Sequence, residues 1–121
     1  MSQITESILD STKKAVGIVP EYPYFDDQII MYINSAFSTL YQLGVGPEDG
    51  FSISDNKTTW SEYTNSNKLL NFVKTYLHMS VQLMFAPPTS SFALEALKQQ
   101  IKEYEWRINV MVDPKVLGGD A

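Results

Sequence analysis

The feature that most constrains this chain is a regular row of apolar side chains near its C-terminus. Their spacing alternates between three and four residues: Leu94, Leu97, Ile101, Tyr104, Ile108 and Met111. Such spacing places every member on one side of an α-helix and is typical of a helix that packs along a neighbour. Pro87 and Pro88 end the preceding helix, and Thr89 or Ser90 is the predicted N-cap. We predict a helix that runs to about Val112 and is roughly 34 Å long.

Three earlier stretches show the same helical period. The first covers residues 4–16 and ends at Gly17, the second covers about 25–42 and ends at Gly44, and the third covers about 66–85. A glycine at the end of a helix adopts the left-handed conformation of a C-cap at little cost. Together the four predicted helices make the chain well over half helical, against a usual content of about one third.

Residues 48–65 differ from the helical stretches. Between Phe51 and Trp60, apolar and polar residues alternate around a turn signal at Asp55 and Asn56. This pattern is typical of a short β-hairpin or of an ordered loop. The predicted fold is therefore all-α: a small antiparallel helical bundle of about four helices, with a long ordered loop or short β-hairpin between helices two and three.

The helical pattern fixes the predicted domain at residues 1–112. Residues 113–121 lose the pattern and carry two glycines and a proline, so we expect a flexible C-terminal tail. Within this tail, Val116 and Leu117 form an apolar pair with no obvious place in the bundle. We expect this pair to contact another protein.

Composition excludes several classes of function. The 121 residues include no cysteine, which rules out a disulfide framework, a thiolate nucleophile and a cysteine-ligated metal site. Nine Lys and Arg against 14 Asp and Glu give a formal net charge of −5, so a large non-specific nucleic-acid surface is not expected. The longest apolar run, Ile29–Ile33, is far shorter than the ~20 residues of a membrane span. The first residues do not read as a signal peptide.

The side chains that carry chemistry form no catalytic pattern. His78 is the single histidine, and its place on the polar stripe of the third helix predicts a solvated side chain. Asp26 and Asp27 fall in the first turn of the second helix, where carboxylates favour the positive end of the dipole. Glu103 and Glu105 point about 200° apart. Neither a G-x-x-x-x-G-K-[ST] nor a G-x-S-x-G motif occurs. We expect no enzyme activity, no metal and no cofactor.

Trp106 and Val110 lie on the polar side of the last helix, about 170° and 150° from the apolar row. Large apolar side chains in such a place mark a contact. Either another part of the same chain covers them, or they form a subunit interface. In the second case we expect them to meet Phe51, Ile53 and Trp60, whose alternating side chains also need a covering surface.

Several segments carry a further signal in their order and spacing. They are Phe25-Asp-Asp-Gln-Ile-Ile-Met-Tyr-Ile-Asn34, Leu43-Gly-Val-Gly-Pro47, Lys74-Thr-Tyr76, Phe85-Ala-Pro-Pro-Thr-Ser-Ser-Phe92 and Ile101-Lys-Glu-Tyr-Glu-Trp-Arg-Ile-Asn109. From residue 3 to about 112 the chain resembles the head–tail connector, or adaptor, proteins of tailed bacteriophages and prophages of Gram-positive bacteria. No single segment is chemically specific.

The resemblance implies a four-helix-type bundle that assembles as a ring of about a dozen copies. Such a ring docks on the portal protein, extends the DNA channel and receives the next neck or tail component. The resemblance also implies a structural protein of the virion neck, assembled in the host bacterial cytoplasm, with no cofactor and no catalytic residues. The acidic balance suits a channel through which duplex DNA passes without sequence-specific binding.

A second class stays open, a small helical regulator that binds nucleic acid or a protein target through a helix-turn-helix pair. Arg107 is the single arginine, and the third helix carries Lys68 and Lys74 alone, too few cations for an ordinary recognition helix. Salt-dependent binding of duplex DNA by the isolated protein would favour this class.

Overall fold

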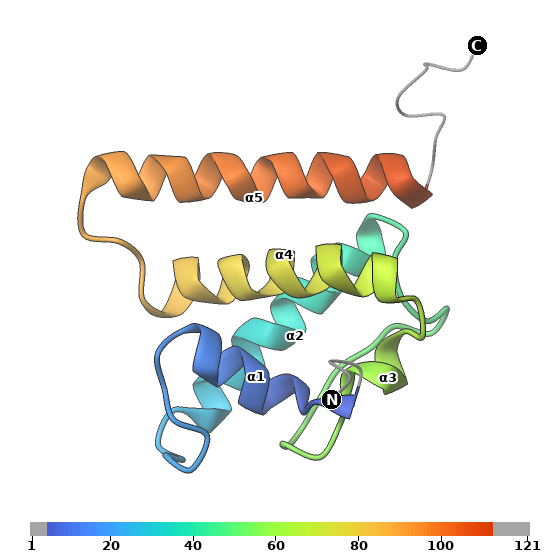
Figure 1. Ribbon diagram of the computed structural model, residues 1–121, viewed down its shortest axis with the longest axis horizontal. Helices are drawn as coiled ribbons and strands as arrows, with labels where there is room; N and C mark the ends of the chain where they lie inside the picture. The colour runs from blue at the N-terminus through green and yellow to red at the C-terminus, as the bar shows by residue number, and fades with distance from the viewer. Residues whose placement is uncertain (1–4, 113–121) are drawn as a thin grey trace.

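The computed structural model describes residues 5–112, and within them the chain folds into helices without any strand (Figure 1). The helices are α1 (Ile8–Ala15), α2 (Asp26–Gln42), α3 (Trp60–Tyr63), α4 (Asn67–Phe85) and α5 (Ser91–Val112). The all-α prediction is confirmed. None of these helices is both long enough and apolar enough to cross a bilayer. The predicted tail 113–121, with Val116 and Leu117, lies outside the described residues.

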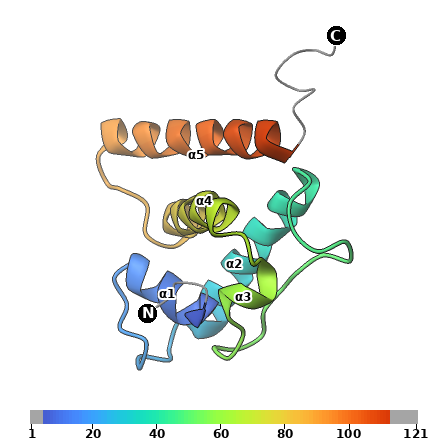
Figure 2. The ribbon, with the colours of Figure 1, turned by 45° about the vertical axis from the view of Figure 1, so that its right-hand side comes forward.

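Helix α4 is the centre of the bundle. Helix α5 runs antiparallel along one side of it, whereas α1 and α2 pack on the other side, with α2 crossing α4 at an angle (Figures 1 and 2). The buried residues of α4 are Leu70, Val73, Tyr76, Leu77, Ser80 and Val81. With the half-buried Phe72, Met79 and Leu83, they occupy about half of the helix circumference, as a helix between two layers requires.

The apolar row of α5 packs against α4, as its spacing predicts. Its buried members are Leu97, Ile101 and Ile108, and its half-buried members are Leu94, Tyr104 and Met111. The ring of Tyr104 lies 6.0 Å from that of Phe72 on α4. Near the end of α5, Asn109 Nδ2 donates a 3.1 Å hydrogen bond to the carbonyl of Leu43. This bond ties the last turns of α5 to the C-terminus of α2.

Two glycines end α1 and α2 where the sequence places them. Gly17 and Gly44 have φ angles of 90° and 95°, a region that side chains other than glycine seldom adopt. The following residues, Ile18 and Val45, each donate a backbone hydrogen bond to the carbonyl five residues earlier, at 2.8 and 2.9 Å. Each helix therefore closes with the hydrogen-bond pattern of a glycine C-cap, and each following side chain packs back on the core.

Segment 48–65 forms no hairpin; an irregular loop leads into the single turn of α3. The end of the loop pairs with the start of α1 instead, through an isolated antiparallel bridge between Ser7 and Thr59, and the side chain of Asn34 holds the middle of the loop. Its Nδ2 donates to the carbonyl of Ile53 at 3.0 Å, and its Oδ1 accepts from the Ile53 N–H at 2.8 Å. Helix α3 then begins with a capping box, in which the Glu62 carboxylate accepts a 3.0 Å hydrogen bond from the N–H of Thr59.

Candidate interaction surfaces

The prediction of a solvated His78 is wrong, because α1 packs over that side of α4. The ring of His78 lies 6.3 Å from that of Trp60, and its Nε2 is buried with no hydrogen-bond partner in residues 5–112. Burial lowers the pKa of His78 to about 4; the charge of Lys74 lowers it further, and that of Glu6 acts in the opposite direction. At neutral pH the imidazole is uncharged, and it lies half-buried at the edge of the core beside Trp60.

Glu103 and Glu105, which the sequence places on different sides of α5, each have a structural partner. Glu103 forms a 2.6 Å ion pair with Arg107 one turn along α5. Glu105 accepts a 2.8 Å hydrogen bond from the hydroxyl of Tyr76. Burial first, and then this hydrogen bond and the charge of Glu105, raise the pKa of Tyr76 above its usual range. In residues 5–112 no group of three or more His, Asp or Glu is placed to hold a metal ion.

Two of the three residues expected in one half of the subunit interface lie in the core of the single chain. Trp60 is 0% exposed, and its indole N–H donates a 3.0 Å hydrogen bond to Ser11 Oγ. Ile53 is buried as well. Phe51 is half-buried, with its ring 5.0 Å from that of Phe37. Trp60 and Ile53 therefore have no surface to offer a neighbouring copy; their alternation reflects a loop that faces its own core.

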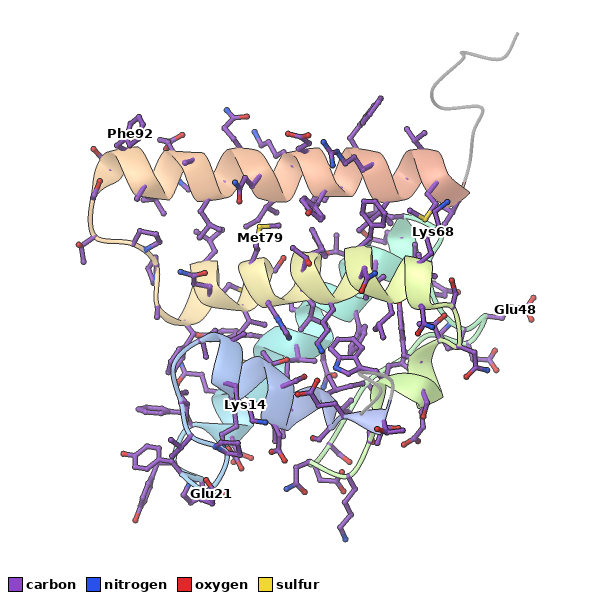
Figure 3. The ribbon with its side chains drawn as sticks, in the orientation of Figure 1. Lys14, Glu21, Glu48, Lys68, Met79 and Phe92 are labelled. Carbon is purple, nitrogen blue, oxygen red and sulfur yellow. The ribbon has the colours of Figure 1, made fainter. Side chains whose placement is uncertain are left out.

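Helix α5 uses one side for the bundle and leaves the other open. Trp106 is 52% exposed, so residues 5–112 leave about half of it uncovered, and Val110 is half-buried. Phe92, 85% exposed, lies within about 40° of Trp106 around the helix and points away from the bundle (Figure 3). The outer face of α5 consists of Phe92, Glu95, Gln99, Lys102, Trp106 and Val110.

A hollow of about 300 Å³, the α5 hollow, borders this face. It is lined by Leu83, Glu95, Lys98, Gln99, Ile101, Lys102 and Glu105. Lys98 Nζ lies 3.8 Å from a carboxylate oxygen of Glu95 in an exposed pair, which contributes little. Lys102 has no ion-pair partner among residues 5–112. The hollow therefore combines the apolar side chains of Leu83 and Ile101 with two lysines and two glutamates, of which Lys102 forms no ion pair within residues 5–112.

A second exposed surface is the aromatic loop, residues 19–25. Its exposed apolar side chains are Val19, Tyr22, Tyr24 and Phe25. The ring of Tyr22 lies 5.1 Å from Tyr24 and 5.8 Å from Phe25, so the three rings form one patch. Sequence analysis missed this patch, because a connector between helices has no period that separates its inner from its outer side. The available signal was the density of aromatic residues beside two prolines, since Tyr22, Tyr24 and Phe25 lie within five residues of Pro20 and Pro23.

A buried lysine holds the aromatic loop in place. Lys13 Nζ donates hydrogen bonds of 2.8 and 2.7 Å to the carbonyls of Pro20 and Tyr22, and pairs with Asp26 Oδ1 at 2.6 Å. All three contacts of the ammonium group therefore fall on the loop or on the first turn of α2. The aromatic rings are exposed, yet the backbone that carries them is fixed from inside the protein.

A helical subunit with a complete core and exposed apolar surfaces is typical of a structural protein that works through contacts with other proteins. The sequence matches the family described as "Phage connector protein" over residues 8–115. The chain belongs to this family, which confirms the resemblance to phage head–tail connectors. Comparison with curated proteins and with solved structures gives no match. Membership of the family supports a structural role in the phage neck.

Proposed function

We propose that about a dozen copies of this protein form a ring that docks on the portal protein of a phage or prophage. The ring extends the DNA channel toward the tail and receives the next neck or tail component. Assembly takes place in the host bacterial cytoplasm, and the finished ring lies in the virion neck. Family membership supports this proposal, and the outer face of α5 is the observation that carries it.

The outer face of α5 supports assembly because an exposed tryptophan on a rigid helix is a strong contact residue. Trp106 lies on α5, a helix of 22 residues, so its backbone position is fixed by the helix. We therefore keep Trp106 and Val110 as the first half of the subunit interface. Phe51 remains a minor candidate for the other half, since it is half-buried.

The distribution of cations supports passage of DNA without tight binding. The net charge is −5, and three cations are already engaged in ion pairs: Lys13 with Asp26, Lys74 with Glu6 and Arg107 with Glu103. Strong binding to the phosphate backbone requires several free cations on one surface. No surface described in residues 5–112 favours the alternative, a regulator that reads nucleic acid.

The tail belongs to the proposal as well. We propose that Val116 and Leu117 contact the portal protein or an adjacent copy when the ring docks. The two residues are the apolar pair of segment 113–121, and apolar side chains anchor protein interfaces when a partner buries them.

Native mass spectrometry at several protein concentrations, with and without portal protein, tests the function. The expected result is a closed ring that portal protein binds or promotes. In a Trp60→Phe background, the emission of Trp106 should shift to the blue as rings form, and Trp106→Ala should prevent assembly while the monomer stays folded. A protein that stays monomeric with portal, or that binds duplex DNA in a salt-dependent manner instead, would contradict the proposal.

A further inference from the structure

We propose that the outer face of α5, together with the α5 hollow, receives the aromatic loop of a second copy of this chain. The inference rests on the proposed function, because an assembly of identical copies supplies both surfaces. It replaces Ile53 and Trp60 as the expected partners of Trp106, since both are buried in their own subunit, and it places the aromatic loop ahead of the half-buried Phe51.

The aromatic loop has the shape and stiffness of the inserted side of an interface. Tyr24 is 79% exposed, and its ring is in contact with that of Tyr22. Below them, the ring of Phe25 lies 5.2 Å from that of Phe85 on α4. Lys13 fixes the backbone of the loop through two carbonyls. Little conformational entropy is therefore left to lose on binding, which favours a tight contact.

The α5 hollow and the adjoining outer face have the chemistry of the receiving side. Leu83 and Ile101 supply apolar surface inside the hollow. Trp106 follows Lys102 by one helical turn, so the tryptophan and the edge of the hollow lie on the same side of α5. An aromatic side chain that enters the hollow would thus also meet the exposed indole.

Charge complementarity favours this pairing. The loop and the start of α2 carry Glu21 and Asp27, which are exposed and form no ion pair within residues 5–112. The α5 hollow carries Lys98 and Lys102, one weakly paired and one unpaired. Glu95 and Glu105 also line the hollow and keep their charges, since Glu95 pairs with Lys98 and the hydroxyl of Tyr76 that bonds to Glu105 is neutral. Lys102, which forms no ion pair within residues 5–112, is therefore the cation that a carboxylate of the loop can meet. Opposite charges around an apolar centre set the orientation of two partners and speed their association.

The two surfaces lie on opposite sides of the subunit, as a repeated joint requires. Phe85, beneath the aromatic loop, and Leu83, in the hollow, are two residues apart on α4 and so point about 200° apart. Figure 3 likewise shows Glu21 of the loop and Phe92 of the outer face at opposite edges of the molecule. One subunit can therefore use both surfaces at once, and two different patches generate a ring or an open chain.

The absence of cysteine from the sequence allows a direct test by disulfide cross-linking. Tyr24→Cys and Gln99→Cys are made in separate copies, mixed and oxidised. A disulfide forms when the two Cα atoms approach to about 4.4–6.8 Å. The expected result is a cross-linked pair that contains one copy of each variant, and, for the double variant, a ladder of covalent oligomers up to the size of the ring.

Two matched mixtures separate this joint from its alternatives. Gln99→Cys mixed with Ser52→Cys tests the loop beside Phe51, and Tyr24→Cys alone tests a contact between two aromatic loops. The proposal would be overturned if a cross-link forms in one of these two control samples and none forms between Tyr24→Cys and Gln99→Cys. Protection of Tyr24→Cys from a thiol reagent by portal protein alone would also overturn it, since the loop would then belong to the portal contact.

Charge reversal gives a second readout that does not depend on oxidation. Lys102→Glu should raise the concentration needed for half-assembly by about tenfold, and Glu21→Lys in the same chain should restore much of the loss. Lys68→Glu, at the far end of α4, is the matched control and should have little effect. Rings seen by native mass spectrometry without the cross-link or the rescue would overturn this joint and leave the proposed function standing. If no rings form under any condition, both this joint and the proposed function are contradicted.

Discussion

The indole N–H of Trp60 donates a 3.0 Å hydrogen bond to Ser11 Oγ and so joins two positions 49 residues apart in the sequence. Ser11 Oγ in turn donates to the carbonyl of Ile8 at 3.0 Å. This short chain of bonds satisfies the polar atoms of a fully buried tryptophan. It also attaches α3 and the loop before it to α1, which explains why segment 48–65 is ordered without a partner strand.

Trp60→Ala should destabilise the monomer by about 3–5 kcal/mol, the usual range for removing a large buried aromatic side chain. Trp106→Ala is the matched control, because its indole is exposed; we expect a change below about 0.5 kcal/mol. Urea unfolding followed by circular dichroism measures both. Equal losses for the two variants would place Trp106 in the core and remove it from the interface.

His78 should make stability fall as the pH is lowered. Its pKa is about 4 in the folded protein, against an ordinary value of 6.5, so the unfolded chain takes up a proton that the folded chain resists. The contribution is fully present above about pH 6.5 and is lost between about 6.5 and 4, with an upper limit of about 3 kcal/mol. Below about pH 4 the contribution of His78 to stability no longer changes with pH.

Urea unfolding at pH values from 7 to 4 measures this dependence, with His78→Gln as the comparison, since glutamine does not titrate. The free energy of unfolding of the native protein should fall steadily relative to that of His78→Gln as the pH is lowered. A parallel decline of both proteins would assign the effect to carboxylates such as Glu6 rather than to His78.

Lys13→Met should cost roughly 2–4 kcal/mol, because it leaves two carbonyls and Asp26 without their partner. Lys14→Met is the matched control; its exposed ammonium group lies 4.0 Å from Glu6, and its loss should change stability by less than about 0.5 kcal/mol. Hydrogen exchange should become faster in residues 18–25 of the Lys13 variant. Unchanged exchange there would show that the loop holds its position without the lysine.

Deletion of residues 113–121 should leave the helical content and the unfolding midpoint close to those of the full chain, while portal binding weakens. The double variant Val116→Ser, Leu117→Ser should reproduce the loss if the apolar pair carries the contact. Binding is measured by co-sedimentation with portal rings. Portal binding that is equal for the full and truncated chains would remove the tail from the docking surface.

Most of the helical fold could be predicted from the sequence, because its determinants are local. The spacing along α5 and the glycines after α1 and α2 act within one or two turns, so the period and the caps identify these helices. At the starts of α4 and α5, the hydroxyls of Ser66 and Ser90 accept backbone hydrogen bonds in the first turn, and Ser90 is one of the two N-caps predicted for α5. Such contacts need no knowledge of the rest of the chain.

The surfaces were harder to predict, because exposure depends on which element covers which face. His78 lies on a stripe that is polar in sequence, yet α1 covers it. Trp60 sits in an alternating segment that looks two-sided, yet one side faces the core. The aromatic loop has no period at all, and the contacts that hold it come from Lys13 on α1, which its place in the sequence does not reveal.

The core that surrounds Trp60 closes within a single chain: α1, α2, α3 and α4 bury its indole completely without help from a neighbour. Within residues 5–112, the core around Trp60 therefore needs no side chain from a neighbouring copy in order to close. Subunits of this kind can enter or leave an oligomer one at a time without unfolding. A mixture of isotopically light and heavy oligomers would then reach a statistical distribution at the rate at which contacts break, not at the rate at which chains unfold.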